Sequence, residues 1–112
     1  MKREQRLRKG TEFDEAYSKG TVVGGPLVVL RVRPNECGYS RWGFAVGKKI
    51  APLSTTRNLM RRRLREAARS LGWSASQDVI VTVRREALGA DYATLREAIQ
   101  RGLHRAEGSV RR

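Results

Sequence analysis

The apolar positions of this chain repeat with two different periods. Alternating and β-branched apolar residues predict three strands, at residues 27–33, 41–49 and 77–85. Residues 34–40 are expected to form a hairpin loop, and Val22 with Val23 adds a short edge strand. From Asp91 onwards, apolar residues recur every three or four positions, which is typical of a half-buried helix.

A short helix is predicted before the first strand. Thr11 can cap its start, and Lys19 followed by Gly20 suits its end. One face of this helix would hold Phe13, Ala16 and Tyr17. With a further helix between the second and third strands, the element order predicts one α+β domain that spans residues 1–112.

The helix between the strands is predicted at residues 55–69 and carries six arginines with one acid, Glu66. At about 100° of rotation per residue, one face gathers Met60, Leu64, Ala67, Ala68 and Leu71. A separate arc holds Asn58, Arg61, Arg62, Arg65 and Arg69. Arginine near a helix start is unfavourable, because the free N–H groups there already carry partial positive charge. An anion is therefore expected at this end, and guanidinium groups match phosphate oxygens.

The strand predicted at residues 41–49 has one bulky and one small face. Trp42, Phe44 and Val46 alternate with three small residues, Gly43, Ala45 and Gly47. Small side chains on one face of a strand allow another segment of the chain to come close.

The charge of the chain indicates its class of partner. Lysine and arginine number 24 against 11 acids, which gives a net charge of +13 and a pI near 11.3. Self-repulsion on this scale predicts a polyanionic partner. Residues 1–9 and 107–112 are expected to be loose basic arms. No apolar run approaches the roughly 18 residues of a membrane span, and Cys37 is the single cysteine. We therefore expect a cytosolic protein.

Catalysis by side chains is not expected from this sequence. His104 is the only histidine, and no paired carboxylates, metal-ligand spacing or glycine-rich phosphate loop can be assembled. The binding residues are more informative, although an arginine-rich helix can also be a solvated face. Phe13 and Tyr17 can be core residues or can stack on unpaired bases, and Arg31 can follow a nucleic-acid backbone along the sheet.

The segment KKIAPLSTTRNLMRRRLREAAR resembles the protein subunit of bacterial ribonuclease P. That family has a lysine pair at a strand end, here Lys48 and Lys49, and then a helix that opens with Arg57 and Asn58. The similarity extends to residues 6–20 and to GFAVGKK. The sequence differs from the family pattern at Leu59, where a basic residue is usual, at Arg63, and by one extra residue in the loop at 50–56.

The resemblance implies a fold and a division of labour. The fold would be a two-layer α+β structure with a mixed four-stranded sheet, three helices and a left-handed βαβ crossover, similar to the second domain of a small-subunit ribosomal protein. A catalytic RNA subunit would bind the Mg²⁺ and remove the 5′ leader of precursor tRNA in the cytoplasm. The protein would be its non-catalytic partner, without a bound cofactor or an obligate protein partner.

The resemblance also implies two sets of binding residues. The RNA-binding set is Lys48, Lys49, Arg57, Asn58, Arg61, Arg62, Arg65 and Arg69. The groove for the single-stranded leader would be formed by Phe13, Tyr17, Arg31, Ala45, Lys48, Arg57 and Arg65. Three other classes remain open: a ribosomal or other structural RNA-binding protein, a DNA-binding helix-turn-helix module, and a nuclease that acts alone.

Overall fold

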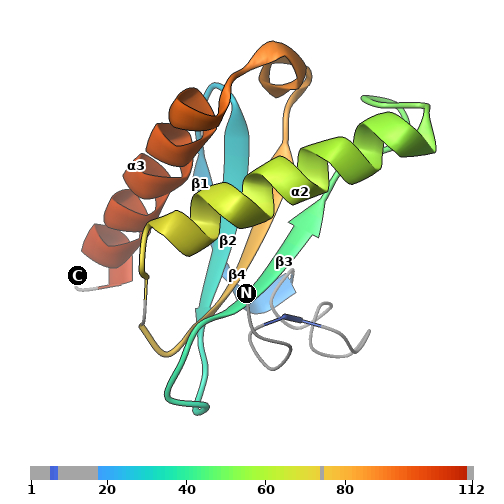
Figure 1. Ribbon diagram of the computed structural model, residues 1–112. Coiled ribbons are helices and arrows are strands. Elements are labelled where there is room, and N and C mark those ends of the chain that lie inside the picture. Colours follow the sequence, from blue (N-terminus) through green and yellow to red (C-terminus); the bar gives the residue numbers. More distant parts are fainter. Residues whose placement is uncertain (1–5, 8–17, 74, 111–112) are drawn as a thin grey trace.

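The computed structural model describes residues 6–7, 18–73 and 75–110. Within them the chain forms four strands, two long helices and a 3₁₀ helix (Figure 1). In chain order these are β1 (Thr21–Gly24), β2 (Val28–Pro34), β3 (Arg41–Ala45), α2 (Ser54–Ser70), β4 (Gln77–Val83), η2 (Arg85–Gly89) and α3 (Tyr92–Val110). The predicted α+β class is confirmed.

The four strands form one mixed sheet in the order β1-β2-β4-β3. β2 pairs antiparallel with both β1 and β4, whereas β3 pairs parallel with β4. Helix α2 connects the two parallel strands and lies in front of the sheet in Figure 1, with β4 to the left of β3. This crossover is therefore left-handed, as the resemblance implied and against the general preference.

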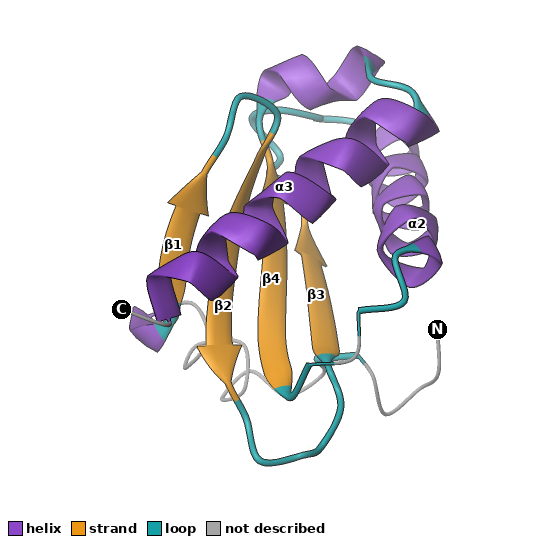
Figure 2. Ribbon diagram, turned by 90° about the vertical axis from the view of Figure 1, so that its left-hand side faces the viewer, coloured by secondary structure: helices purple, strands orange, loops and turns teal. Residues whose placement is uncertain are grey.

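Both long helices cover the same face of the sheet, and the main core lies between the two layers (Figure 2). The strands contribute Val23, Val28, Leu30, Val32, Trp42, Val79, Val81 and Val83, and the helices contribute Met60, Leu64, Ala67, Ala68, Leu95, Ile99, Leu103 and Ala106. Gly102 allows α3 to approach β2, because a Cβ there would lie 2.4 Å from Cδ1 of Leu30. The predicted apolar faces of both helices are confirmed, except that Tyr92, expected on the buried face of α3, is exposed.

The opposite face of the sheet has its own small cluster, in which Leu7 packs against Ile80. The N–H of Leu7 donates to the carbonyl of Trp42 at 2.8 Å, and Arg6 forms a parallel bridge with Trp42. Gly43 lies beside Ile80 in the sheet, so the small face predicted for this strand is where the segment docks. For Arg6 and Leu7 the prediction of a loose arm is wrong.

Several predicted boundaries need correction. The strand expected at 41–49 ends at Ala45, because the chain then turns: the N–H groups of Ile50 and Ala51 both donate to the carbonyl of Gly47. The strand expected at 77–85 ends at Val83 and is followed by η2. The C-terminal arm expected from residue 107 is helical through Val110.

The hairpin expected at residues 34–40 is wrong, because β4 lies between β2 and β3 in the sheet. The remaining predictions are confirmed or fall outside the described residues. The edge strand at Val22 and Val23 is β1. The arginine helix ends at Ser70 with Leu71 as its C-cap, and Gly72 follows with φ of +62°, a conformation that favours glycine. The helix predicted from Thr11 is described only at Ser18–Lys19, so the face with Phe13 and Tyr17 is outside the described residues.

Candidate RNA interface

Helix α2 presents its arginines to solvent because its apolar stripe is used for packing. Met60, Leu64, Ala67 and Ala68 are buried against the sheet. Around this stripe, Arg62 and Arg69 are exposed and Arg57, Arg61, Arg63 and Arg65 are half-buried. Leu59 is 46% exposed, so its side chain lies away from the core, as its position on the helix predicted.

The start of α2 is electropositive. The N-cap residue Leu53 makes no side-chain capping hydrogen bond among the described residues, and the first turn contains no acid. Its free N–H groups are therefore not neutralised locally. Lys48 and Lys49 are exposed in the turn that follows β3 and precedes this helix.

Arg57 and Asn58 have identifiable partners in this first turn. Nη1 of Arg57 donates to the carbonyls of Ala51 and Pro52, at 2.9 and 2.8 Å, and so fixes the loop before the helix. Oδ1 of Asn58 accepts a 2.8 Å hydrogen bond from Nη1 of Arg61, one turn later. The loop at residues 50–56, which contains the extra residue, is thus held in place by Arg57.

Farther along α2, the positive charge is poorly compensated. Glu66 pairs with Arg62 at 3.5 Å, and both side chains are more than half exposed, so the pair is weak. Together with Arg65 and Arg69 these two residues line a shallow hollow on the helix surface. One carboxylate among these guanidinium groups leaves a surface suited to a polyanion.

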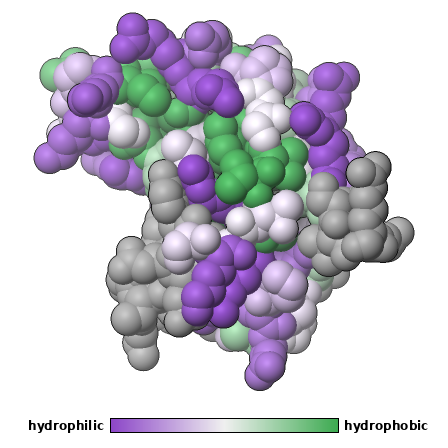
Figure 3. All heavy atoms as spheres, turned by 180° about the vertical axis from the view of Figure 1, so that it is seen from behind, coloured by the Kyte–Doolittle hydropathy of each residue, from purple (hydrophilic) through white to green (hydrophobic). Residues whose placement is uncertain are grey.

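The predicted leader groove is described on one side only. Arg31 and Ala45 lie on the sheet face opposite the helices, since Arg31 pairs with Ile80 and Ala45 with Thr82. Figure 3 shows this face, on which hydrophobic surface is bordered by hydrophilic side chains. Arg65 reaches the β3 edge of the sheet, beside Gly43 and Phe44. Phe13 and Tyr17, the other residues predicted for this groove, lie outside the described residues.

Some arginines stabilise the fold by donating hydrogen bonds to other groups of the protein. Arg41 donates from Nε and Nη2 to the two carboxylate oxygens of the buried Asp78, each at 2.8 Å. Nδ2 of Asn35 donates to the same carboxylate at 2.8 Å. Nε of Arg84 donates to the carbonyl of Gly25 at 2.7 Å. Sequence reasoning did not foresee these contacts, because each partner is distant in the chain.

Sequence reasoning also did not assign a binding role to Arg6. The structure places Arg6 beside Arg61 and Arg65, at the edge of β3. The only sequence signal for this docking was the small face of the strand at Gly43.

The described residues offer no constellation for side-chain catalysis. No group of three histidine, cysteine or acidic residues that could hold a metal ion occurs among them. His104 is exposed on α3 and lies edge-on to Trp73, with ring centroids 6.3 Å apart. Cys37 is exposed in the loop between β2 and β3.

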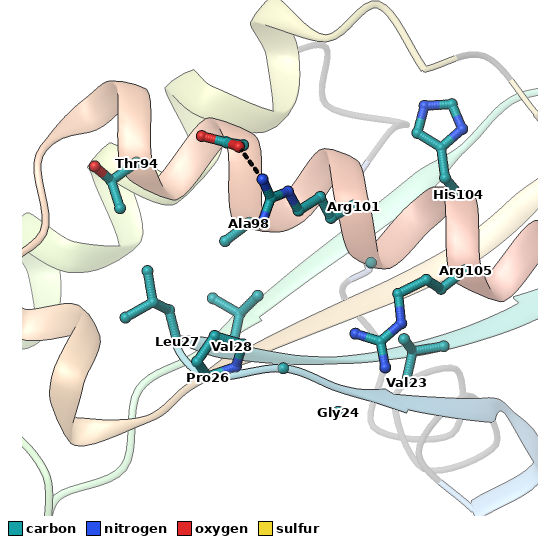
Figure 4. A pocket seen from close by; sticks show the side chains of 13 residues that line it. Val23, Gly24, Pro26, Leu27, Val28, Thr94, Ala98, Arg101, His104 and Arg105 are labelled. Carbon is teal, nitrogen blue, oxygen red and sulfur yellow. Dashed lines mark ion pairs between the residues drawn. The ribbon is translucent and has the colours of Figure 1, made fainter.

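A groove of about 720 Å³ lies between α3 and the β1–β2 turn (Figure 4). Its walls are largely aliphatic, with Val23, Val28 and Ala98 among them. The one carboxylate among its described lining residues, Glu97, is in an ion pair with Arg101 of the same helix. The groove therefore lacks the uncompensated arginine cluster that makes α2 the stronger candidate for RNA binding.

No helix in the described part of the chain has both the length and the apolar character needed to cross a bilayer.

A family model described as Ribonuclease P matches residues 1–107. The chain belongs to the ribonuclease P protein family.

Relatives in this family match most of the chain. The ribonuclease P protein component of Dehalococcoides mccartyi (strain CBDB1) is 31% identical over 107 residues, which is 96% of this chain and 88% of the relative. The ribonuclease P protein component of Caldanaerobacter subterraneus subsp. tengcongensis is 36% identical over 98 residues, covering 86% of this chain and 84% of the relative.

Solved structures in the family share the fold. The ribonuclease P protein of Staphylococcus aureus superimposes with a TM-score of 0.81 at 26% identity and covers 91% of this chain and 94% of its own. The ribonuclease P protein of Thermotoga maritima gives a TM-score of 0.76 at 28% identity, with coverage of 86% and 92%. The sheet order and the position of α2 described above are thus those of a ribonuclease P protein.

Proposed function

We propose that this chain is the protein component of ribonuclease P, which binds the catalytic RNA subunit and the 5′ leader of precursor tRNA. The observation that carries the proposal is the arginine face of α2, joined to an uncapped helix start and to Lys48 and Lys49, in a member of this family. A ribosomal or other structural RNA-binding role is less well supported, because the relatives are ribonuclease P protein components.

In the proposed mechanism, the protein binds and positions RNA and leaves bond cleavage to the RNA subunit. Lys48, Lys49, Arg57, Asn58, Arg61, Arg62, Arg65 and Arg69 would contact phosphates of the catalytic RNA near the cleavage site. Guanidinium groups on a rigid helix neutralise closely spaced phosphates without the entropy cost of a flexible arm. Part of the charge screening that Mg²⁺ would otherwise provide then comes from the protein, so less Mg²⁺ would be needed.

The leader would lie on the sheet face that carries Arg31 and Ala45. Arg31 is half-buried on this face, along which an extended strand of RNA could pass. Phe13 and Tyr17, which the resemblance assigns to the same groove, lie outside the described residues. Stacking of a base on an aromatic side chain contributes about 1–3 kcal/mol, which would favour precursor over mature tRNA. In this proposal the RNA subunit holds the Mg²⁺, the protein acts without a cofactor or another protein, and the complex is cytoplasmic.

Reconstitution with the cognate RNA subunit tests the function. At low Mg²⁺, the protein is expected to raise the cleavage rate of precursor tRNA and to bind leader-bearing substrate more tightly than leaderless tRNA. The experiment is repeated with Tyr17→Ala, which is expected to reduce mainly the preference for the leader. Cleavage at low Mg²⁺ that is the same with and without the wild-type protein would refute the proposed function. An equal loss on both substrates for Tyr17→Ala would refute only the groove.

A further inference from the structure

Three arginines from two distant parts of the sequence lie together at the outer edge of β3, where residues 6 and 7 pair with Trp42. Arg6 is held there by the docked segment, since the N–H of Leu7 donates to the carbonyl of Trp42 and the Leu7 side chain is buried against Ile80. Arg61 and Arg65 reach the same place from α2. The position of Arg6 is therefore fixed by backbone pairing and by the burial of Leu7. Its own exposed side chain is not needed for this docking and can contact a ligand.

These side chains border a cavity of about 170 Å³ that is open to solvent. Its lining consists of Arg6, Leu7, Trp42, Gly43, Phe44, Arg61 and Arg65. Trp42 and Phe44 are the aromatic residues of this lining, and their stacked rings have centroids 6.0 Å apart. The volume is below the roughly 300 Å³ at which small-molecule pockets begin, so the cavity suits a small group. No carboxylate of the described residues lines it.

The electrostatics of this cavity are unfavourable without an anion. Nε of Arg65 is buried and has no hydrogen-bond acceptor in the described structure. Burial lowers the pKa of the Arg65 guanidinium, and the nearby charges of Arg6 and Arg61 lower it further. Arginine remains charged even so, and a buried, unpaired donor is costly. Arg61 is only partly satisfied, through its hydrogen bond to Asn58.

We propose that this cavity binds one phosphodiester group of an RNA strand, with Arg6 and Arg65 donating to its oxygens and Arg61 adding positive charge. The inference rests on the proposed function and adds Arg6 as an RNA-binding residue. Phosphate is the anion that matches, because it presents several acceptors to converging guanidinium groups. The strand belongs either to the catalytic RNA or to the leader of the precursor.

The test is a double-mutant cycle of Arg6→Ala and Arg65→Ala in the full-length protein. Affinity is measured for the catalytic RNA alone, and then for leader-bearing and leaderless precursor with the reconstituted complex. Arg105→Ala, which removes an exposed arginine on α3, is the matched control for net charge. Thermal unfolding of each protein without RNA shows whether the fold is kept.

Each single variant is expected to weaken binding roughly tenfold or more, as for the loss of a charge-assisted hydrogen bond. The double variant is expected to lose less than the product of the two losses, because both side chains would contact the same phosphate. Coupling with the catalytic RNA alone assigns the phosphate to that RNA, and coupling only with leader-bearing precursor assigns it to the leader. Arg6→Ala should not lower the melting temperature, since it removes repulsion from Arg65.

The proposal is overturned if Arg6→Ala binds every RNA as Arg105→Ala does, or if the losses of Arg6→Ala and Arg65→Ala multiply. These outcomes are distinct from failure of the proposed function, which is judged on the wild-type protein. If the wild type stimulates cleavage at low Mg²⁺ and the cycle shows no coupling, only the phosphate pocket is refuted.

Discussion

At the residue scale, the arginines of this protein perform two different tasks. Arg41 and Arg84 donate to groups of the protein itself, a buried carboxylate and a backbone carbonyl. Arg62 and Arg69 extend into solvent from α2. Arg57 is intermediate, because Nη1 fixes the preceding loop while the residue stays at the start of the proposed RNA surface. Composition alone cannot separate these tasks, since the separation depends on which partner lies nearby.

Arg41→Met tests the structural task. Asp78 is 2% exposed, so removal of the bidentate guanidinium leaves a buried carboxylate with only Asn35 from this network. The free energy of unfolding is expected to fall by about 3 kcal/mol, as for other broken buried pairs. Urea denaturation measures it, with Arg85→Met as the exposed control. A loss in Arg41→Met no larger than in the control would contradict this assignment.

At the element scale, the two long helices begin in opposite ways. Before α3, Oδ1 of Asp91 accepts a 2.8 Å hydrogen bond from the N–H of Thr94. Hydrogen bonding from the Thr94 side chain, and then from this N–H, lowers the pKa of Asp91. Helix α2 starts after Leu53 without a side-chain cap or an acid in its first turn. Helix α3 is therefore built for stability at its start. The start of α2 keeps N–H groups and positive charge available for an anion.

Thr55→Glu tests the meaning of this uncapped start. Thr55 is exposed in the first turn of α2, where an acid compensates the helix dipole by about 0.3–1 kcal/mol. Stability measured by thermal unfolding is expected to rise, while affinity for the catalytic RNA is expected to fall because of repulsion from phosphate. Thr55→Gln serves as the uncharged control. If RNA affinity were unchanged in Thr55→Glu, the start of α2 would not lie near phosphate.

At the scale of the whole molecule, the chain has a net charge of +13, and its described residues form a body with two different sheet faces. The layer of α2 and α3 covers one face of the sheet, and the opposite face carries Arg31 and Ala45. Arg65 lies where these surfaces approach each other, at the edge of β3. This arrangement is suited to holding two RNA segments at once.

The salt dependence of binding tests whether α2 is the main contact surface. Each phosphate neutralised steepens the dependence of log K on log salt by roughly 0.7–0.9. Replacement of Arg61, Arg62 and Arg69 by glutamine is expected to reduce the slope for the catalytic RNA by about two to three. The matched control replaces Arg96, Arg101 and Arg105 on α3, with the same change in charge. Equal reductions in both triple variants would indicate general attraction and not a defined surface.

The sequence determined the elements and the class of partner. Periodicity located the strands and α2 to within a few residues, because burial of one face leaves a period of about two or 3.6 in the chain. The apolar stripe of Met60, Leu64 and Ala67 was predictable for the same reason. The six arginines of this helix already indicated a polyanion, and the family motif around Arg57 and Asn58 directed the interpretation to ribonuclease P.

Only the tertiary structure decided how distant residues combine. The pairing of Arg41 with Asp78 joins neighbouring strands, and the docking of Leu7 on Ile80 brings Arg6 to Arg65. Neither contact has a local period, because each depends on the order of strands in the sheet. The handedness of the crossover came from the resemblance and not from any pattern in the chain. Local patterns record which face of an element is buried, and the long-range packing of those faces decides which charges meet.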